Sequence, residues 1–242
     1  NAHVQKTLNL LDDMLNLGKA NNVYWVEIPA AKEEKPTFRW ALHRAPIKID
    51  WVLRERLYEQ VRAIVFTSAT LTVNRDFGFF LNRFGLDRAD YGEKVHARIL
   101  PSVFQTKKDI LFAIPQNVGR YHPRRADEFI ERASQEIRQL LHLQSHRSLL
   151  LFNARVRMEA IYERTAPHLT TLGLEPFAQG KSGSRGDIEE LRRNPRRVQF
   201  GLKSMWEGVD APGMSYVIIE KLPFPLFFDP VVAARMERAR KE

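Results

Sequence analysis

The sequence predicts an α/β protein built on a parallel β-sheet flanked by helices. From Arg125 onward, short apolar runs alternate with longer segments in which apolar residues recur at helical spacing. The runs are rich in leucine, β-branched and aromatic residues, as is typical of strands that are buried on both faces. Strands that alternate with helices at this spacing form a parallel sheet with right-handed crossovers.

The N-terminal third predicts a different arrangement, in which a helix precedes a pair of strands. The helix is amphipathic and is stopped by Gly18. The second strand alternates apolar and polar residues, as a half-buried hairpin partner does. The expected elements are a helix at residues 2–18, strands at 23–28 and 37–44, a helical segment at 50–60 and a strand at 63–66.

The pattern of apolar and polar residues changes near residues 72–76. We therefore place a domain boundary there, with residues 1–75 in one domain and 76–242 in the other. A glycine at position 85 closes the first helix after this boundary. The expected helices are at 77–84, 126–141, 155–169, 187–193 and 233–242, and the expected strands at 95–99, 109–114, 148–152, 174–178, 198–202 and 216–219.

The composition favours a polyanionic partner. The 242 residues have a formal net charge of +9, a balance that favours nucleic acid over an acidic membrane surface. A soluble protein that is merely basic is the alternative. The sequence contains no cysteine, which removes disulfides and cysteine-ligated metal centres from this segment and fits a reducing cytoplasm.

The sequence contains no complete catalytic constellation. It has no GxxxxGK[ST] phosphate loop and no GxSxG nucleophile elbow. Its seven histidines are scattered, so we expect no metal site. It shows no apolar stretch long enough for a membrane helix and no signal-peptide pattern. Because it begins without methionine and stops in a charged run, we expect a segment of a longer protein.

Polar and basic residues follow three of the expected parallel strands. The carboxyl ends of parallel strands share one edge of the sheet, where open α/β sheets bind ligands, so these three loops should converge. Amides, hydroxyls and cations at such an edge suit phosphodiester oxygens. Plain connections between elements are the alternative. The candidate nucleic-acid contacts are Asn153, Arg155, Gln179, Lys181, Ser182, Ser204 and Trp206.

Several motifs occur in the order seen in DinG/XPD-like superfamily 2 DNA helicases. They are TSATL at Thr67 to Leu71, LLLFN at Leu149 to Asn153, Gln179-Gly180, MWEGVD at Met205 to Asp210 and KLPFP at Lys221 to Pro225. The resemblance covers most of the chain from Ala45 to Ala239, and the last two motifs are the specific ones. It implies the tail of an Arch-like insertion and the end of a first RecA-like domain in residues 1–75, and most of a second RecA-like domain in residues 76–242.

The resemblance also assigns roles to two groups of residues. Motif III of this family couples the nucleotide state to the grip on DNA, and motif V faces both the nucleotide cleft and the DNA backbone. The positions that resemble motif III are Ser68, Ala69 and Thr70, and those that resemble motif V are Glu207, Gly208 and Asp210.

Two positions depart from the usual pattern of the family. Met205 replaces a usual phenylalanine, and Asn153 replaces a usual serine or threonine, but each keeps the apolar or polar character of its position. The phosphate loop, the DExH acid pair and motif VI are missing from the sequence. We expect the first two upstream and motif VI downstream of this segment, which should therefore be inactive as an ATPase by itself.

The resemblance implies that the intact protein is an ATP-dependent DNA helicase with a role in DNA repair. It would use ATP and Mg²⁺, act in the cytoplasm and move 5′ to 3′ on single-stranded DNA or on a duplex with a single-stranded tail. Its second partner would be helicase domain 1 of the same chain, and no membrane would be involved. An iron–sulfur cluster in the intact protein stays undetermined. The alternative is a non-catalytic module that binds single-stranded nucleic acid, for example beside a nuclease.

Overall fold

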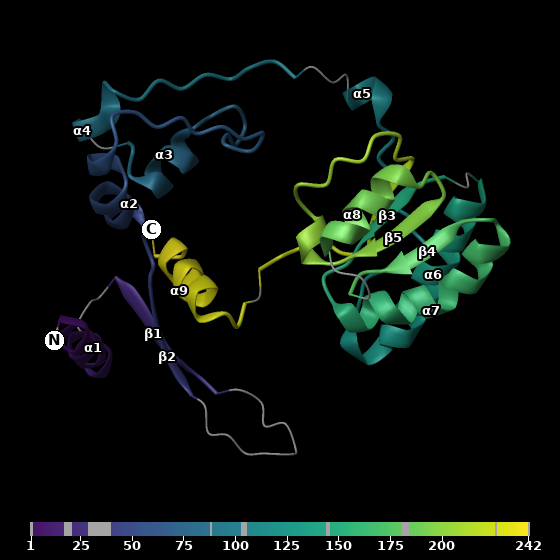
Figure 1. Cartoon of the computed structure of the whole chain (residues 1–242), viewed down its shortest axis with the longest axis horizontal. Helices are drawn as coiled ribbons and strands as arrows, with labels where there is room; N and C mark the ends of the chain where they lie inside the picture. Colours follow the sequence, from purple (N-terminus) through teal and green to yellow (C-terminus); the bar gives the residue numbers. More distant parts are fainter. Residues whose placement is uncertain are drawn as a thin grey trace. The chain divides into compact units, whose positions relative to one another are not determined.

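The computed structural model describes residues 2–16, 21–28, 40–87, 89–102, 106–143, 146–180, 184–225 and 227–241. The chain forms two compact units, of which one comprises Asn1–Gln105 with Pro225–Glu242 and the other Thr106–Phe224. Figure 1 shows their elements. Lys181 and Ser182, and residues 37–39 of the expected second strand, lie outside the described residues. The assignment of residues 1–75 and 76–242 to different helicase domains stays a prediction.

The first unit contains the expected hairpin and is closed by the C-terminal helix. Its strands β1 (Asn22–Glu27) and β2 (Ala41–Pro46) pair antiparallel. Two arginines of α9 (Pro230–Ala239) donate hydrogen bonds to groups beside the hairpin. Arg235 donates to the carbonyl of Ile47 at 3.1 Å, and Arg238 donates to the side-chain oxygen of Asn21 at 2.9 Å. The remaining helical elements of this unit are α1 (Ala2–Leu15), α2 (Asp50–Arg56), η1 (Tyr58–Gln60), α3 (Gly78–Phe84) and α4 (Ala89–Gly92).

Three expected strands are wrong. Residues 63–66 and 95–99 have no regular secondary structure, and Asp109 ends the short helix α5 (Thr106–Asp109) instead of beginning a strand. A strand needs a hydrogen-bonding neighbour, which β-propensity alone does not supply. Phe66 instead packs edge-on against Phe80 and Phe84 of α3, at ring-centroid distances of 5.4 and 5.7 Å.

The second unit is built on the parallel sheet that the sequence predicts. Its strands are β3 (Ser148–Leu151), β4 (Glu175–Ala178), β5 (Arg197–Gly201) and β6 (Tyr216–Ile219), in the spatial order β4-β5-β3-β6. All neighbours are parallel, and the central strand β3 aligns Leu150 with Phe200 of β5 and with Ile218 of β6. The four carboxyl ends therefore lie along one edge of the sheet.

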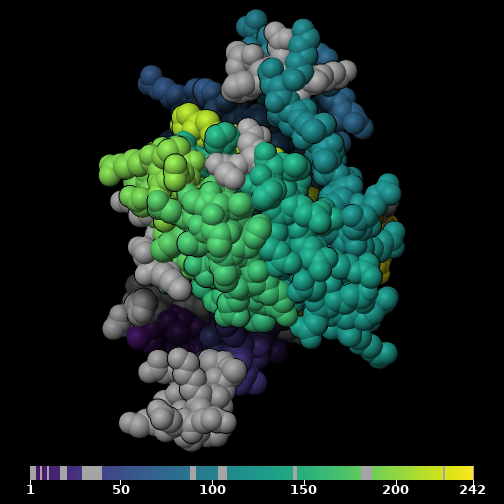
Figure 2. All heavy atoms as spheres, turned by 90° about the vertical axis from the view of Figure 1, so that its right-hand side faces the viewer, coloured from purple at the N-terminus to yellow at the C-terminus, as the bar shows by residue number. Residues whose placement is uncertain are grey.

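Helices cover both faces of this sheet. Helices α6 (Ala126–Leu143) and α7 (Arg155–Thr171) pack on the face formed by Leu150, Phe152, Val198 and Phe200. In Figure 2 the teal and green atoms of these segments form a continuous surface. Leu191 of α8 (Ser184–Arg193) packs with Leu149, Leu151, Met205 and Ala211 on the other face.

Burial of the strand side chains fixes the sheet and therefore its edges. Leu150, Val198 and Phe200 are fully buried, and the rings of Phe152 and Phe200 stack at 5.8 Å. Each such side chain contributes about 1.5–3 kcal/mol relative to an exposed one.

The η2 turn (Pro123–Arg125) leads into α6. No helix among the described residues is long and apolar enough to cross a membrane.

Candidate nucleic-acid interface

The loops that follow the four parallel strands contact one another at the carboxyl edge of the sheet. Hydrogen bonds join the loop after β4 to the loop after β5, and the loop after β3 to the loops after β5 and β6. The convergence predicted for Asn153, Gln179 and Ser204 is therefore confirmed. Their contacts with DNA stay a prediction.

Gln179 connects the ends of β4 and β5. Its Nε2 lies 2.5 Å from the hydroxyl oxygen of Ser204, and its Oε1 accepts from the backbone N–H of Leu202 at 2.6 Å. Only 9% of Gln179 is exposed, whereas Ser204 is exposed. The amide thus positions the loop after β5 and binds the hydroxyl of a residue that is itself exposed.

Gly180 lets an arginine approach the backbone closely. Its φ is +113°, and a Cβ at this position would lie 2.6 Å from Nη1 of Arg155. The same nitrogen donates to the carbonyl of Gln179 at 3.3 Å and lies 3.6 Å from the carboxylate of Glu159. A side chain at position 180 would therefore displace Arg155, which belongs to the first turn of α7.

Asn153 joins the ends of β3 and β6. Its Nδ2 donates to the carbonyls of Lys221 and Leu222, at 3.1 and 2.8 Å. Both of these residues belong to the KLPFP motif and are exposed. The amide nitrogen of Asn153 is therefore engaged in holding this motif at the edge.

Two neighbouring residues fix the short turn η3 (Lys203–Met205) to the sheet. The Met205 side chain is buried and fills the space above Gly201, where a Cβ would lie 2.7 Å from its sulfur. Trp206 is half-buried and its Nε1 donates to the carbonyl of Phe152 at 3.4 Å. Trp206 therefore supports the loop, which adds a structural role to its expected DNA contact.

The residues that resemble motif V follow this turn and face solvent. Glu207 and Asp210 are exposed, and Gly208 has a φ of +72°. Nε of Arg192 in α8 donates to the Asp210 carbonyl at 2.5 Å, so the loop is held by its backbone. Within the described part of the chain, neither carboxylate forms an ion pair.

The residues that resemble motif III lie in the first unit. The hydroxyls of Ser68 and Thr70 are 3.1 Å apart, and the backbone N–H of Thr70 donates to Ser68 Oγ at 3.2 Å. Ser68, Ala69 and Thr70 are exposed in a turn. Their expected coupling role stays a prediction.

A buried ion pair at the same sheet edge was missed by the sequence reasoning. Arg157 Nε lies 2.7 Å from Oε1 of Glu220, whose side chain is 3% exposed. Burial alone would lower the pKa of Arg157, but the hydrogen bond and charge of Glu220 leave that pKa raised. The Tyr121 ring covers the pair, with Arg157 Cζ 4.5 Å from the ring centroid. The only sequence signal was the position of Glu220 directly after β6.

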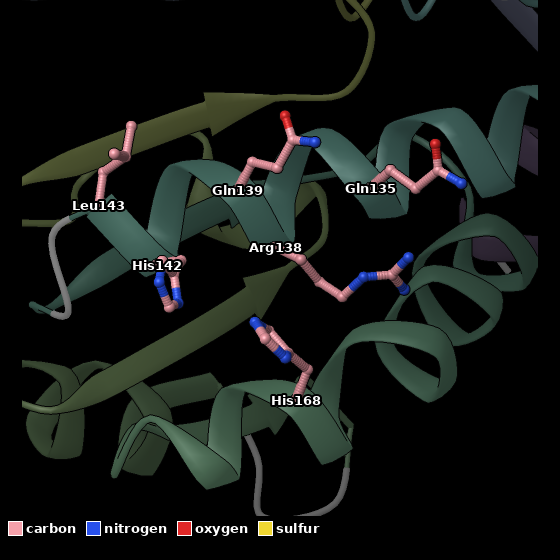
Figure 3. Close-up of a pocket in the computed structure, with 6 residues that line it drawn as sticks. All are labelled: Gln135, Arg138, Gln139, His142, Leu143 and His168. Carbon is pink, nitrogen blue, oxygen red and sulfur yellow. The ribbon is translucent and has the colours of Figure 1, made fainter.

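A separate hollow between α6 and α7 lies away from this edge. It has a volume of about 550 Å³ and is lined by Gln135, Arg138, Gln139, His142, Leu143 and His168 (Figure 3). His142 and His168 belong to the last turns of their helices, near the amino ends of the strands. Among the described residues, no group of three or more histidines, cysteines and carboxylates could hold a metal ion.

Comparison with known proteins shows which proteins the chain is similar to. Residues 137–242 match the family model of the helicase C-terminal domain. The chain is 26% identical over 222 residues to the 3′-5′ exonuclease DinG of Bacillus subtilis, and 26% identical over 220 residues to the ATP-dependent DNA helicase YoaA of Escherichia coli. It is 28% identical over 226 residues to the ATP-dependent helicase DinG of Mycobacterium tuberculosis. These alignments cover 90, 90 and 89% of the chain but 23, 31 and 31% of the relatives.

The parallel sheet, its flanking helices and the domain match together define a RecA-like helicase C-terminal domain. The relatives support the resemblance to DinG-like helicases, and the parallel sheet with its flanking helices confirms the predicted fold class. The chain spans 23–31% of the length of these curated relatives.

Proposed function

We propose that this chain is the C-terminal motor segment of an ATP-dependent DNA helicase of the DinG type. Its part is to hold single-stranded DNA along the carboxyl edge of the sheet. The observation that supports this most directly is the hydrogen-bonded junction of Gln179, Ser204 and Leu202, in a chain that matches the helicase C-terminal domain. The junction presents a hydroxyl beside the exposed cation Lys203.

The groups at this edge divide into those that hold the loops and those that meet the DNA backbone. Gln179 and Asn153 use their amides within the protein, so they position the loops. Ser204, Lys203 and Arg155 are exposed and supply a hydroxyl and two cations. Such groups bind phosphate oxygens without reading bases, so we expect little sequence preference.

Glu207 and Asp210 are proposed to lie on the nucleotide side of the same loop. Carboxylate oxygens suit Mg²⁺, which fits the ATP and Mg²⁺ that the intact protein is proposed to use. This loop has no phosphate cradle of its own, so helicase domain 1 of the same protein must supply one. ATP hydrolysis supplies the free energy for movement along DNA, and the residues of this chain orient the loop.

The finer features of the intact protein are proposed from its resemblance to the family. They are movement from 5′ to 3′, a single strand or a duplex with a single-stranded tail as substrate, a role in DNA repair and a cytoplasmic location. Coupling of the nucleotide state to the grip on DNA through Ser68, Ala69 and Thr70 is likewise proposed from the resemblance. The 242-residue chain itself should show negligible ATPase activity, and steady turnover that Asp210→Ala abolishes would contradict this.

A charge reversal tests the DNA grip. Lys203→Glu should weaken binding of fluorescently labelled oligothymidylate, measured by anisotropy, and should reduce the slope of log K against log salt by about 0.7 or more. Arg193→Glu is the matched control, because Arg193 is an exposed cation at the C-terminal end of α8. Equal effects of both substitutions would argue against the proposed edge.

The name of one relative favours a second candidate function. The Bacillus subtilis relative is described as a 3′-5′ exonuclease, and this chain spans 23% of it. In that reading the same edge binds single-stranded DNA in a module without motor activity. Single-strand-stimulated ATPase activity of the intact protein, lost on Asp210→Ala, would exclude it.

A further inference from the structure

Most arginines of the unit Thr106–Phe224 have acceptors within the protein. Arg147 and Arg196 donate to backbone carbonyls. Eight others lie within 4.0 Å of a carboxylate, in the pairs Arg132–Glu128, Arg138–Glu131, Arg155–Glu159, Arg157–Glu220, Arg164–Glu131, Arg192–Glu189, Arg193–Glu189 and Arg197–Asp187. Positive charge on this unit is therefore largely compensated.

Among the arginine side chains that the structure describes in this unit, three in one short stretch are the exception. Arg120, Arg124 and Arg125 are exposed, and none of them forms an ion pair with any carboxylate that the structure describes. Arg124 and Arg125 also stand directly before α6, which begins at Ala126. Cations are unfavourable at the positive end of a helix dipole, by roughly 0.3–1 kcal/mol each. This placement does not serve the stability of the fold.

Tyr121 places this stretch at the end of β6. Its ring lies 4.5 Å from Cζ of Arg157 and 5.3 Å from Nζ of Lys221, measured to the ring centroid. Its edge packs on Phe129 of α6 at 5.4 Å. The stretch is therefore next to Lys221, whose backbone carbonyl accepts from Asn153.

The uncompensated cations thus extend the polar row of the carboxyl edge. Neighbouring strands are spaced about 4.8 Å apart, so the row from β4 to β6 spans about 14 Å. Lys203 follows β5, Lys221 follows β6, and Tyr121 of the stretch 120–125 lies next to Lys221. A polyanion that lies along the edge would meet positive charge over this whole length and past it.

We propose that Arg120, Arg124 and Arg125, together with Lys221, bind the phosphodiester backbone of single-stranded DNA beyond β6. The proposal rests on the proposed function and lengthens the contact that this function requires. Guanidinium groups bind phosphate oxygens in a fork geometry, so they supply affinity without base preference. Tyr121 acts as a positioning residue, because its ring faces are already close to Arg157 and Lys221.

The test compares two charge-matched variants of the 242-residue chain. Arg124→Gln with Arg125→Gln removes two cations of the stretch, and Arg193→Gln with Arg196→Gln removes two near the amino ends of the strands. Binding of labelled oligothymidylate is measured between about 50 and 200 mM salt. Each lost single-strand phosphate contact reduces the salt slope by about 0.7, so the first variant should bind about 25-fold more weakly at 0.1 M salt. The second should bind like the wild type.

The outcomes separate this inference from the proposed function. Absence of binding by the wild-type chain would overturn the proposed function and the extension with it. Wild-type binding with equal affinities and slopes for the two variants would overturn the extension alone. Lys221→Gln is a second test of the proposed contact beyond β6. It should weaken oligothymidylate binding by about 5-fold and reduce the salt slope by about 0.7. Circular dichroism and thermal unfolding check that each variant is folded.

Discussion

The amide nitrogen of Gln179 lies 2.5 Å from the hydroxyl oxygen of Ser204, which ties the end of β4 to the end of β5. The same side chain accepts from the backbone of Leu202. One buried amide therefore determines where the loop after β5 begins. The proposed DNA grip depends on this hydrogen-bonded junction, because Ser204 and Lys203 follow directly from it.

Gln179→Ala should destabilise the second unit. The substitution leaves the N–H of Leu202 without its acceptor, and an unsatisfied buried group costs about 1–3 kcal/mol. Urea denaturation measures the free energy of unfolding of the variant and of the wild type. Gln135→Ala is the control, since Gln135 bonds to Glu131 on the exposed surface of α6 and its loss should change stability by less than about 0.5 kcal/mol. Equal losses for both variants would contradict the bridging role of Gln179.

Gly180→Ala should cost more stability than Gly119→Ala. Both glycines have positive φ, but a Cβ at Gly180 would meet Arg155 at 2.6 Å, whereas nothing lies within 4 Å of a Cβ at Gly119. Gly119→Ala reports the strain of a left-handed residue without a steric contact, roughly 1 kcal/mol, whereas the φ of +113° at Gly180 lies outside the left-handed region and adds further strain. Adding Arg155→Ala to Gly180→Ala should recover part of the loss, which a double-mutant cycle on urea midpoints would show. Strictly additive losses for Gly180→Ala and Arg155→Ala would show that the close approach of Arg155 to position 180 does not affect stability.

Glu220→Ala should be strongly destabilising, because it leaves Arg157 charged and largely buried. Breaking a buried ion pair from one side typically costs about 3–5 kcal/mol. The exposed pair Arg132–Glu128 is the control, and Glu128→Ala should cost less than about 1 kcal/mol. Thermal unfolding of both variants measures the difference. A loss for Glu220→Ala no larger than that for Glu128→Ala would show that the pair does not fix the end of β6.

Asp187 should give stability a pH dependence opposite to that of an ordinary ion-paired carboxylate. Its side chain is 1% exposed, and burial raises its pKa above the usual 3.8, although the charge of Arg197 acts in the other direction. A carboxyl whose pKa is raised on folding binds its proton more tightly in the native state. Its contribution to stability is therefore largest below pH 3.8 and is lost as pH rises through the raised folded pKa.

Asp187→Asn isolates this effect. The unfolding free energy of the wild type should fall relative to that of Asp187→Asn as pH rises from 3.8 through the raised pKa of Asp187. Urea titrations at several pH values measure this difference. Glu189→Gln is the matched variant, because it removes a carboxylate from the exposed face of the same helix. A difference between wild type and Asp187→Asn that does not vary with pH would contradict the raised pKa.

The sheet of the second unit follows closely from the sequence, whereas the strands expected elsewhere do not. The runs that became β3 and β5 are buried on both faces because helices cover those strands, whereas Val217 and Ile219 of the equally apolar run β6 are exposed. Residues 63–66 have the same strand-like composition but no regular structure. Strand formation there would depend on a neighbouring strand, and such a requirement is not encoded in the run itself.

The candidate site shows the same division. Parallel topology was enough to predict that the loops containing Asn153, Gln179 and Ser204 converge. It could not predict that Asn153 would donate to Lys221 and Leu222, or that Arg157 would pair with Glu220, 63 positions away. Those contacts depend on how side chains from distant segments meet after folding. The same is true of the uncompensated arginines, which stand out only when the other pairs are known.

The central claim is that single-stranded DNA lies along the carboxyl edge of the sheet. Titration of oligothymidylate into isotopically labelled chain, followed by amide chemical shifts, tests it directly. We predict that the largest shifts fall on residues 153–155, 179–180, 202–206 and 220–222. Shifts confined to the amino ends of the strands and the α6–α7 hollow, or no shifts on binding at this edge, would contradict the account.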